Sequence, residues 1–272
     1  GEPLSLGEAL AETRATSDSK DARLAVPKVA FEVLHRINRV TPIMPSALVT
    51  FSLLDNDDKA MTVEEGRRVL KPLLEYINRR GLDLSEEINL EDYGGLYDAL
   101  RTLEREGVIR RYTDGPDDIY WIAENRAHEA AFYRNTLIHH LVTRAIVEVA
   151  LVRVAEENAS NVSDATWEEA VRLRDVLKYE FFFPRTGHFA ADVAAEVEIA
   201  YPGWEEATFD ADEVLPTLAK SQLFVAHRTI GPFLEAYGVA ADRLALRDPS
   251  EQIDREEFIL ECIGAAQQRW YQ

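Results

Sequence analysis

Cysteine is nearly absent from this sequence. Cys262 is the only one among 272 residues, so the chain can form neither an intrachain disulfide nor a zinc site built from cysteines. This usage is typical of a reducing compartment. No apolar run reaches the roughly 18 residues that a membrane-spanning helix needs. The opening residues, GEPLSLGEAL, also have neither the basic start nor the apolar block of a signal peptide.

Positive charge is scarce as well. The chain has 30 Lys and Arg against 49 Asp and Glu, for a formal net charge of -19. A surface of this sign repels phosphate backbones and disfavours flat docking on anionic lipid. The hydrophobic content of 46% is that of a globular protein with a buried core. The length allows one large domain or two to three small ones.

The common motifs of phosphate binding and hydrolysis are missing. The sequence has no Gly-rich phosphate loop, no nucleophile elbow and no helix with two metal-binding histidines. His139 and His140 are adjacent, so on a helix their side chains point about 100° apart and cannot both bind one metal ion. We therefore expect no cofactor and no metal site, and we interpret this pair as packing or partner contacts.

His188 and Asp192 form the one acid-base candidate found from spacing alone. A carboxylate four residues after a histidine lies on the same helix face, where it could orient the ring as a general base. Such pairs also occur at helix starts for capping reasons. We favour this structural interpretation over a catalytic one.

Proline and capping residues mark the first half of the chain. Apolar residues recur at helical spacing over 28–40, and the segment TPIMP then interrupts the helix. Pro45 suits the first position of the next helix. Thr62, with Glu65 three residues later, predicts a capping box. Gly81 suits the end of that helix, whereas Pro72 within it predicts a kink or a break.

The following segment predicts a third helix and a hairpin. The helix over 93–107 ends near Gly107, and the short β-rich runs VIRRY and DIYWI flank a turn with Asp114-Gly115. Three helices followed by a hairpin are typical of a winged-helix module, here about 44–123. Its acidic residues oppose DNA binding, so we interpret it as a packing module.

The second half predicts further helices. Apolar pairs between 128 and 156 cover more than half of the circumference of one long helix, which should be buried on most sides. Thr166, with Glu169 three residues on, predicts the start of the next helix. Others are expected at 188–200, 212–237 and 254–271. The fold class is therefore mainly α: a helical bundle-like domain with a winged-helix-type module of three helices plus a β-hairpin.

Several stretches, taken in order, resemble a known family. These are RINRVTPIMPSALV at 36–49, a Tyr-Arg-Asn element that opens the long helix, and a Lys-Tyr-Glu-Phe-Phe-Phe helix end. They resemble the C-terminal half of the membrane-associated glycerol-3-phosphate acyltransferases, the large bacterial type related to the mitochondrial enzyme. The opening GEPL resembles the last strand of that family's acyltransferase domain. The residues that carry the resemblance are Tyr133, Arg134, Asn135, Lys178, Glu180, Phe181, Phe182 and Phe183.

The resemblance implies a parent enzyme whose catalytic part is not in this chain. The family's signature is His-x-x-x-x-Asp, but the fifth residue after each of the six histidines is Val40, Tyr133, Arg144, Ala145, Val193 or Pro232. None is an acid, so we expect no catalytic residue here. The implied boundaries are 1–27 for the end of the acyltransferase domain and a linker, 28–125 for the winged-helix-like module and 126–272 for the helical C-terminal domain.

The parent would transfer an acyl group from acyl-CoA or acyl carrier protein to the sn-1 position of glycerol 3-phosphate, at the cytoplasmic side of the cell membrane. This chain would then be a scaffold or regulatory region that docks on the acyltransferase domain, with a homodimer contact possible. The alternatives are a non-enzymatic protein-protein interaction module and, less favoured on charge, a transcription regulator.

The Tyr-Arg-Asn element also carries a structural expectation. If Arg134 lies at the buried start of the long helix, it needs a carboxylate partner, for which Glu180 is one candidate. Arg134→Ala would then destabilise the fold by roughly 3–5 kcal/mol.

Overall fold

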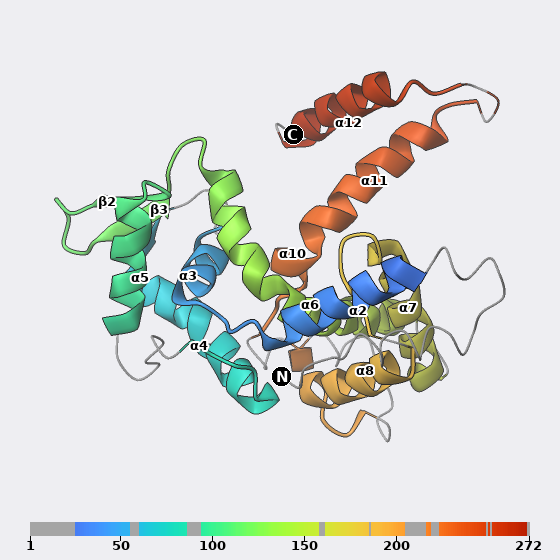
Figure 1. The fold of residues 1–272 in the computed structure, drawn as a ribbon, viewed down its shortest axis with the longest axis horizontal. Helices are drawn as coiled ribbons and strands as arrows, with labels where there is room; N and C mark the ends of the chain where they lie inside the picture. Colours follow the sequence, from blue (N-terminus) through green and yellow to red (C-terminus); the bar gives the residue numbers. More distant parts are fainter. Residues whose placement is uncertain are drawn as a thin grey trace.

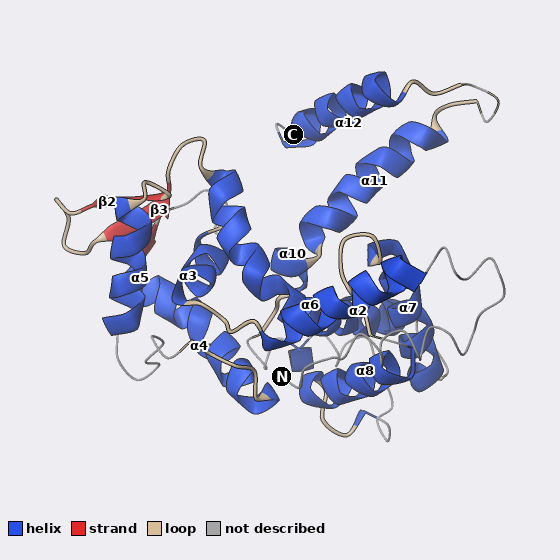
Figure 2. Cartoon of the chain, viewed as in Figure 1, coloured by secondary structure: helices blue, strands red, loops and turns tan. Residues whose placement is uncertain are grey.

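The computed structural model describes residues 25–54, 60–85, 94–157, 161–184, 186–204, 216–218, 223–248, 250 and 252–270. The predicted linker and the GEPL stretch lie outside these residues. The described chain is mainly helical with one small sheet, which confirms the mainly α class (Figure 2). The helices are α2 Ala25–Val40, α3 Pro45–Leu53, α4 Val63–Arg80, α5 Gly94–Arg105, α6 Ala127–Glu156, α7 Val162–Leu177, α8 Thr186–Ala200, α10 Ala226–Thr229, α11 Gly231–Ala245 and α12 Arg255–Trp270.

The predicted hairpin is present and belongs to a three-stranded antiparallel sheet. Its strands are β1 Met61–Thr62, β2 Ile109–Tyr112 and β3 Ile119–Ile122, in the order β1-β3-β2. β1 was not predicted, because two residues are too few to show an alternating pattern. The sheet and α5 close a small core around Leu103, Ile109 and Tyr120, at the left of Figure 1.

Local chemistry sets the ends of α3 and α4 as predicted. Pro45 occupies the first turn of α3. The Thr62 side chain accepts a hydrogen bond from the Glu65 backbone N–H, and the Glu65 carboxylate accepts one from the Thr62 N–H, which completes the capping box. Gly81 ends α4 with φ 61°, in the left-handed region that glycine adopts readily.

Of the kink or break predicted at Pro72, the break is wrong, because helix α4 continues through this residue. Proline removes one backbone N–H from the helix and crowds the preceding turn. Leu70 before the proline and Leu73, Tyr76 and Ile77 after it are buried in the same core. This shared burial stabilises the helix on both sides of the proline.

Two other predicted boundaries differ from the structure. Helix α7 begins at Val162, because the Asn161 side chain accepts the Asp164 backbone N–H at 3.2 Å and acts as the cap. Thr166 is therefore a buried interior residue and not a cap. The helix predicted over 212–237 is not helical at 223–225, and α11 instead runs on to Ala245.

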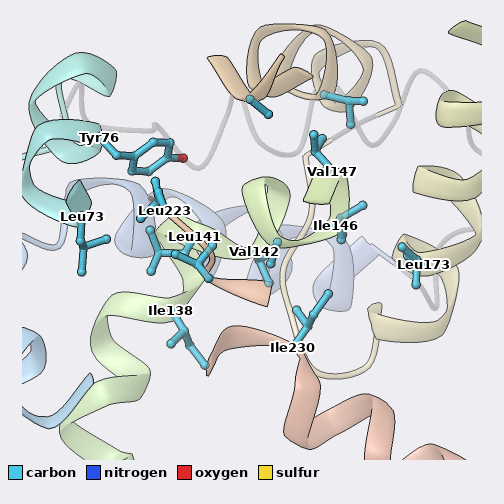
Figure 3. Packing of buried hydrophobic residues seen from close by; sticks show 14 of the residues in the cluster. Leu73, Tyr76, Ile138, Leu141, Val142, Ile146, Val147, Leu173, Leu223 and Ile230 are labelled. Atoms are coloured by element: carbon cyan, nitrogen blue, oxygen red, sulfur yellow. The ribbon is translucent and has the colours of Figure 1, made fainter. Parts of the chain in front are cut away.

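Helix α6 is the centre of the fold. It packs against α3, α7, α8 and α10. Figure 3 shows buried side chains of α6 together with those of α4, of Leu173 in α7, and of Leu223 and Ile230 on either side of α10. In contrast, α11 and α12 pair with each other and project from the body (Figure 1). None of the described α12 side chains is buried. Among the described helices, none combines the length and apolarity that crossing a bilayer requires.

Candidate functional site: a buried charge network on helix α6

Two opposite charges lie inside the most apolar part of α6. Arg144 and Glu148 are four residues apart and therefore on one helix face. The side chain of each is only 1% exposed, and Arg144 Nε lies 2.8 Å from Glu148 Oε1. Removing two charges from water costs several kcal/mol each unless partners satisfy them. The surrounding groups therefore decide whether this pair is stable.

Glu148 finds its remaining partners 77 and 78 residues further along the chain. Its Oε2 accepts hydrogen bonds from the backbone N–H groups of Val225 and Ala226, both at 2.9 Å. Arg144 Nη2 also donates to the Leu223 carbonyl at 3.4 Å. The carboxylate thus binds the first N–H groups of α10, which have no acceptor within that helix. Burial raises the pKa of Glu148, and the nearby Arg144 charge opposes this rise.

A second buried carboxylate joins α8 to α4. Glu196 is 1% exposed, and its Oε1 accepts from the Tyr76 hydroxyl at 2.8 Å and pairs with Arg80 Nε at 2.8 Å. Burial raises the pKa of Glu196, and the charges of Arg80 and Arg144 lower it. Burial and the Glu196 charge raise the pKa of Tyr76 well above its ordinary value.

These five residues form one group, because the Arg144 charge acts on both Tyr76 and Glu196. We call Tyr76, Arg80, Arg144, Glu148 and Glu196 the buried charge network. Its hydroxyl and its two carboxylates are hydrogen-bonded within the network or to the start of α10, and the described residues contain no His/Cys/Asp/Glu group able to hold a metal ion. It links α4, α6, α8 and the start of α10, and its chemistry is that of a clamp between helices.

Sequence reasoning missed this network. The available signal was an arginine and a glutamate, four residues apart, within the otherwise apolar stretch Leu141–Leu151. A charge pair in such a setting must be either buried together or placed on an exposed stripe. The sequence alone does not show which of these two arrangements the pair adopts, because the residues that cover the pair come from α8, α10 and the segment before α10.

The Tyr-Arg-Asn element lies elsewhere on α6, in its first turns. The Tyr133 hydroxyl donates to Glu106 Oε2 at 2.7 Å, and so ties α6 to the turn after α5. Arg134 is half-buried and donates to the Asn135 side chain, with Nη2–Oδ1 3.0 Å. Asn135 is exposed. Arg134 has no carboxylate partner among the described residues, and the expected deep burial is wrong, because the α6 start is covered on only part of its circumference; Phe132 is 70% exposed.

The second set of resemblance residues ends α7. Phe181 and Phe183 are buried in the main core, whereas Phe182 is exposed and meets Phe31 of α2 edge-on, with ring centroids 5.0 Å apart. Glu180 accepts from the Tyr237 hydroxyl of α11 at 2.9 Å.

Lys178 is exposed and lies 3.9 Å from Asp175. The two sets of resemblance residues thus fasten α6 and α7 to neighbouring elements at separate places.

The adjacent histidines fasten α6 to the last turn of α2 and to the residue that follows it. His139 Nε2 lies 2.8 Å from the Asn38 carbonyl oxygen and His140 Nε2 lies 3.1 Å from that of Thr41, so each ring donates an N–H to a carbonyl. Burial, followed by the neighbouring His139, lowers the pKa of His140 to about 4. Burial also lowers the pKa of His139. Both contacts agree with the packing interpretation.

His188 does not complete an acid-base pair. Its side chain is exposed, and no hydrogen bond or ion pair joins it to Asp192 in the described part of the chain. The charge of Asp192 instead acts on Glu196, whose pKa it raises.

A groove of about 410 Å³ lies between α4 and the start of α10. Its walls include Phe51, Leu73 and Val225, and Arg68 and Arg228 stand among its polar residues. Glu65 and His227 also line the groove.

Comparison with known proteins adds an independent finding. The family model described as the glycerol-3-phosphate acyltransferase C-terminal region matches residues 1–272. A protein named "Putative acyltransferase plsB1" from Mycobacterium bovis is 36% identical over 271 residues, which cover 98% of this chain. The proteins of the same name from Mycobacterium tuberculosis strains CDC 1551 and H37Rv match equally. The chain spans 43% of the length of each.

Proposed function

The chain belongs to the family of glycerol-3-phosphate acyltransferase C-terminal regions, and on this premise we propose that it is the helical scaffold of an enzyme that acylates glycerol 3-phosphate. The observation that carries the proposal is the family match over all 272 residues. The chain spans only 43% of its relatives, which leaves room in such a protein for a separate acyltransferase part.

The proposed parent reaction joins an acyl group to the sn-1 hydroxyl in phospholipid biosynthesis, at the cytoplasmic side of the cell membrane. The hydroxyl oxygen forms an ester bond with the acyl carbon of acyl-CoA or acyl carrier protein, and the thioester C–S bond breaks. The hydroxyl proton passes to a histidine base and then to the leaving thiolate. Because no histidine of this chain has an acid five residues later, we assign that base to the acyltransferase part.

The scaffold role is supported by where the charges are buried. The buried charge network joins four elements that are far apart in sequence, and it leaves no reactive group facing solvent. Such a network fixes the relative positions of helices, which is what a docking surface for a second domain requires. The acyltransferase domain of the same protein is the proposed partner, with a homodimer contact as a further possibility.

Within the scaffold, we propose that 28–125 is a winged-helix-type module and 126–272 is a helical domain. The order of α3, α4, α5 and the hairpin supports the module. Both units share a core, because α3 and α4 contribute side chains to both hydrophobic clusters.

The same module is proposed not to bind DNA. Arg111 of β2 is already paired with Glu104 at 3.3 Å and with Asp118 at 3.5 Å, which leaves less positive charge for phosphates. Titration with duplex DNA at about 0.15 M salt should show no micromolar binding, since binding of that strength needs several phosphate contacts. Salt-dependent micromolar binding would contradict the packing role.

The test of the enzyme assignment compares the isolated chain with the full-length protein that contains it. The full-length protein should transfer acyl groups from acyl-CoA or acyl carrier protein to glycerol 3-phosphate, and the isolated chain should not exceed background. Activity of the isolated chain that His188→Ala abolishes would place a catalytic base here. A folded full-length protein without acyl transfer would refute the parent reaction.

A further inference from the structure

The groove between α4 and the start of α10 combines an apolar floor with basic side chains. Its floor consists of buried side chains from three segments, namely Phe51 of α3, Leu73 of α4 and Val225 just before α10. Arg68 of α4 and Arg228 of α10 also line it. Its volume of about 410 Å³ lies in the range of roughly 300–1,000 Å³ that is usual for small-molecule sites.

One wall of the groove is a single face of α4. Glu65, Arg68, Val69 and Pro72 all line the groove, and their spacing of three, four and seven residues places them on the same side of the helix. The facing wall is the segment 223–228, which is more than 150 residues further along the chain. The recess therefore exists only because the tertiary structure brings these two segments together.

The charges that line the groove are mainly positive. Its one carboxylate, that of Glu65, is held by the capping box, where Oε2 accepts from the Thr62 N–H at 2.8 Å and from the Thr62 hydroxyl at 2.9 Å. These hydrogen bonds lower the pKa of Glu65. With His227 neutral, Arg68 and Arg228 give the groove a net charge of +1 (two minus one) in a chain of net charge -19. The groove therefore attracts small anions that most of the surface repels.

Arg228 is held in place at the groove. Its Cζ lies over the Phe51 ring, 5.4 Å from the ring centroid, and its Nε lies 3.4 Å from His227 Nε2. Stacking on an aromatic face fixes the plane of a guanidinium. A fixed guanidinium fork matches the oxygen atoms of a carboxylate or a phosphate. The same recess thus offers a positioned anion-binding group and an apolar surface beside it.

The buried charge network positions the wall that faces α4. Leu223 and Val225 line the groove. The Leu223 carbonyl accepts a hydrogen bond from Arg144, and the Val225 N–H donates one to Glu148. This wall is therefore already fixed to α6. A ligand that binds between preorganised walls loses less free energy to ordering them.

We propose that the groove binds a small amphiphilic anion, with a carboxylate or phosphate head group at Arg68 and Arg228 and an aliphatic body on the apolar floor. The guanidiniums select the head group. The floor selects the body, because Phe51, Leu73 and Val225 have no side-chain group that forms hydrogen bonds. The proposal goes beyond the proposed function, because it requires neither acyl transfer nor a second domain.

Isothermal titration of the full 272-residue chain tests the proposal. Decanoate and decyl phosphate serve as probes below their micellar concentrations, and at least one should bind saturably. The tighter of the two identifies the head group. Decanol lacks the charge and inorganic phosphate lacks the apolar body, so each should bind at least roughly tenfold more weakly. Shortening the tighter probe should weaken binding by about threefold to fourfold for each methylene removed.

Variants of the groove locate the site. Arg68→Gln/Arg228→Gln should weaken binding of the tighter probe by roughly tenfold or more. Arg68 is exposed, so Arg68→Gln alone should keep the wild-type melt and still weaken binding. Val69→Trp keeps every charge but fills the groove, and it should weaken binding as well.

The matched control removes two positive charges from the same helix. Arg67→Gln/Arg79→Gln changes exposed residues of α4 that do not line the groove, and it should bind the probe within about twofold of the wild type. Its net charge equals that of Arg68→Gln/Arg228→Gln, so a general effect of charge on anion binding would weaken both variants equally.

Three outcomes would overturn the proposal. They are no saturable binding of decanoate or decyl phosphate, an equal loss in the control variant, and decanol binding as tightly as both anions. None of these measurements depends on acyl transfer, so their failure is separate from failure of the proposed function.

Discussion

The first and middle turns of α6 each contain one arginine, and the two behave differently. Arg134 is half-buried and bonds to the side chain of its neighbour Asn135. Arg144 is 1% exposed and paired with Glu148, within a core that spans four elements. Both occur in the same helix, and both have apolar neighbours in sequence. The difference shows that depth of burial depends on which distant segments cover the helix.

The largest effect is expected from the buried arginine. Arg144→Ala leaves Glu148 buried without its countercharge, so the free energy of unfolding should fall by roughly 3–5 kcal/mol. Urea or thermal unfolding of the isolated chain measures the loss. Arg144→Met/Glu148→Gln should recover part of it, since glutamine still accepts from the start of α10 while no charge remains unpaired. An unchanged melting temperature for Arg144→Ala would show that this arginine, like Arg134, contributes little to stability.

A smaller loss is expected at the α4 end of the same network. Tyr76→Phe removes the hydroxyl donor to Glu196 but leaves the ion pair with Arg80, and should cost about 1.5–3 kcal/mol, the range for a hydrogen bond to a charged group. Chemical denaturation is the measurement. Tyr237→Phe, which removes the exposed bond to Glu180, is the matched control and should cost less. Equal losses would show that burial adds nothing to the Tyr76 bond.

The histidine pair should make stability depend on pH. In the folded chain the pKa of His140 is lowered from 6.5 to about 4, so between these values the unfolded chain binds more protons. The melting temperature should therefore fall as pH decreases from 6.5 through about 4. Glu148 and Glu196 have raised pKa values, so their stabilising contribution changes in the opposite direction, falling as pH rises above 4.5.

Comparison with a variant separates these opposing contributions. His139→Gln/His140→Gln should flatten the acid loss or reverse its slope, because only the carboxylates then titrate in this window. If the variant and wild type lost melting temperature in parallel between pH 6.5 and 4, the histidines would not be the cause.

The smallest effect is expected at the first turns of α6. Arg134→Ala removes a half-buried guanidinium whose described bond is to exposed Asn135, so it should cost less than about 1 kcal/mol. This replaces the larger loss expected from the sequence. A thermal melt of Arg134→Ala beside Arg144→Ala checks the contrast directly, and similar losses for both would refute it.

The sequence by itself determined what depends on neighbours a few residues away. The Thr62–Glu65 capping box, the Gly81 helix end, the Pro45 helix start and the Asp114-Gly115 hairpin were all predicted and are observed. Each depends on backbone groups within one turn of the residue concerned. The order of the motifs along the chain also indicated the family.

Tertiary structure decided the features whose partners are distant. Glu148 meets Val225 across 77 residues and Tyr76 meets Glu196 across 120, and no local pattern encodes either meeting.

The prediction that Thr166 caps α7 was also wrong. The Asn161 side chain accepts the Asp164 backbone N–H and begins the helix earlier, and Thr166 is buried. Four aliphatic side chains of α2 are 40–50% exposed. Periodicity predicts an apolar stripe on this helix, but only the segments packed against a helix determine whether that stripe faces the core.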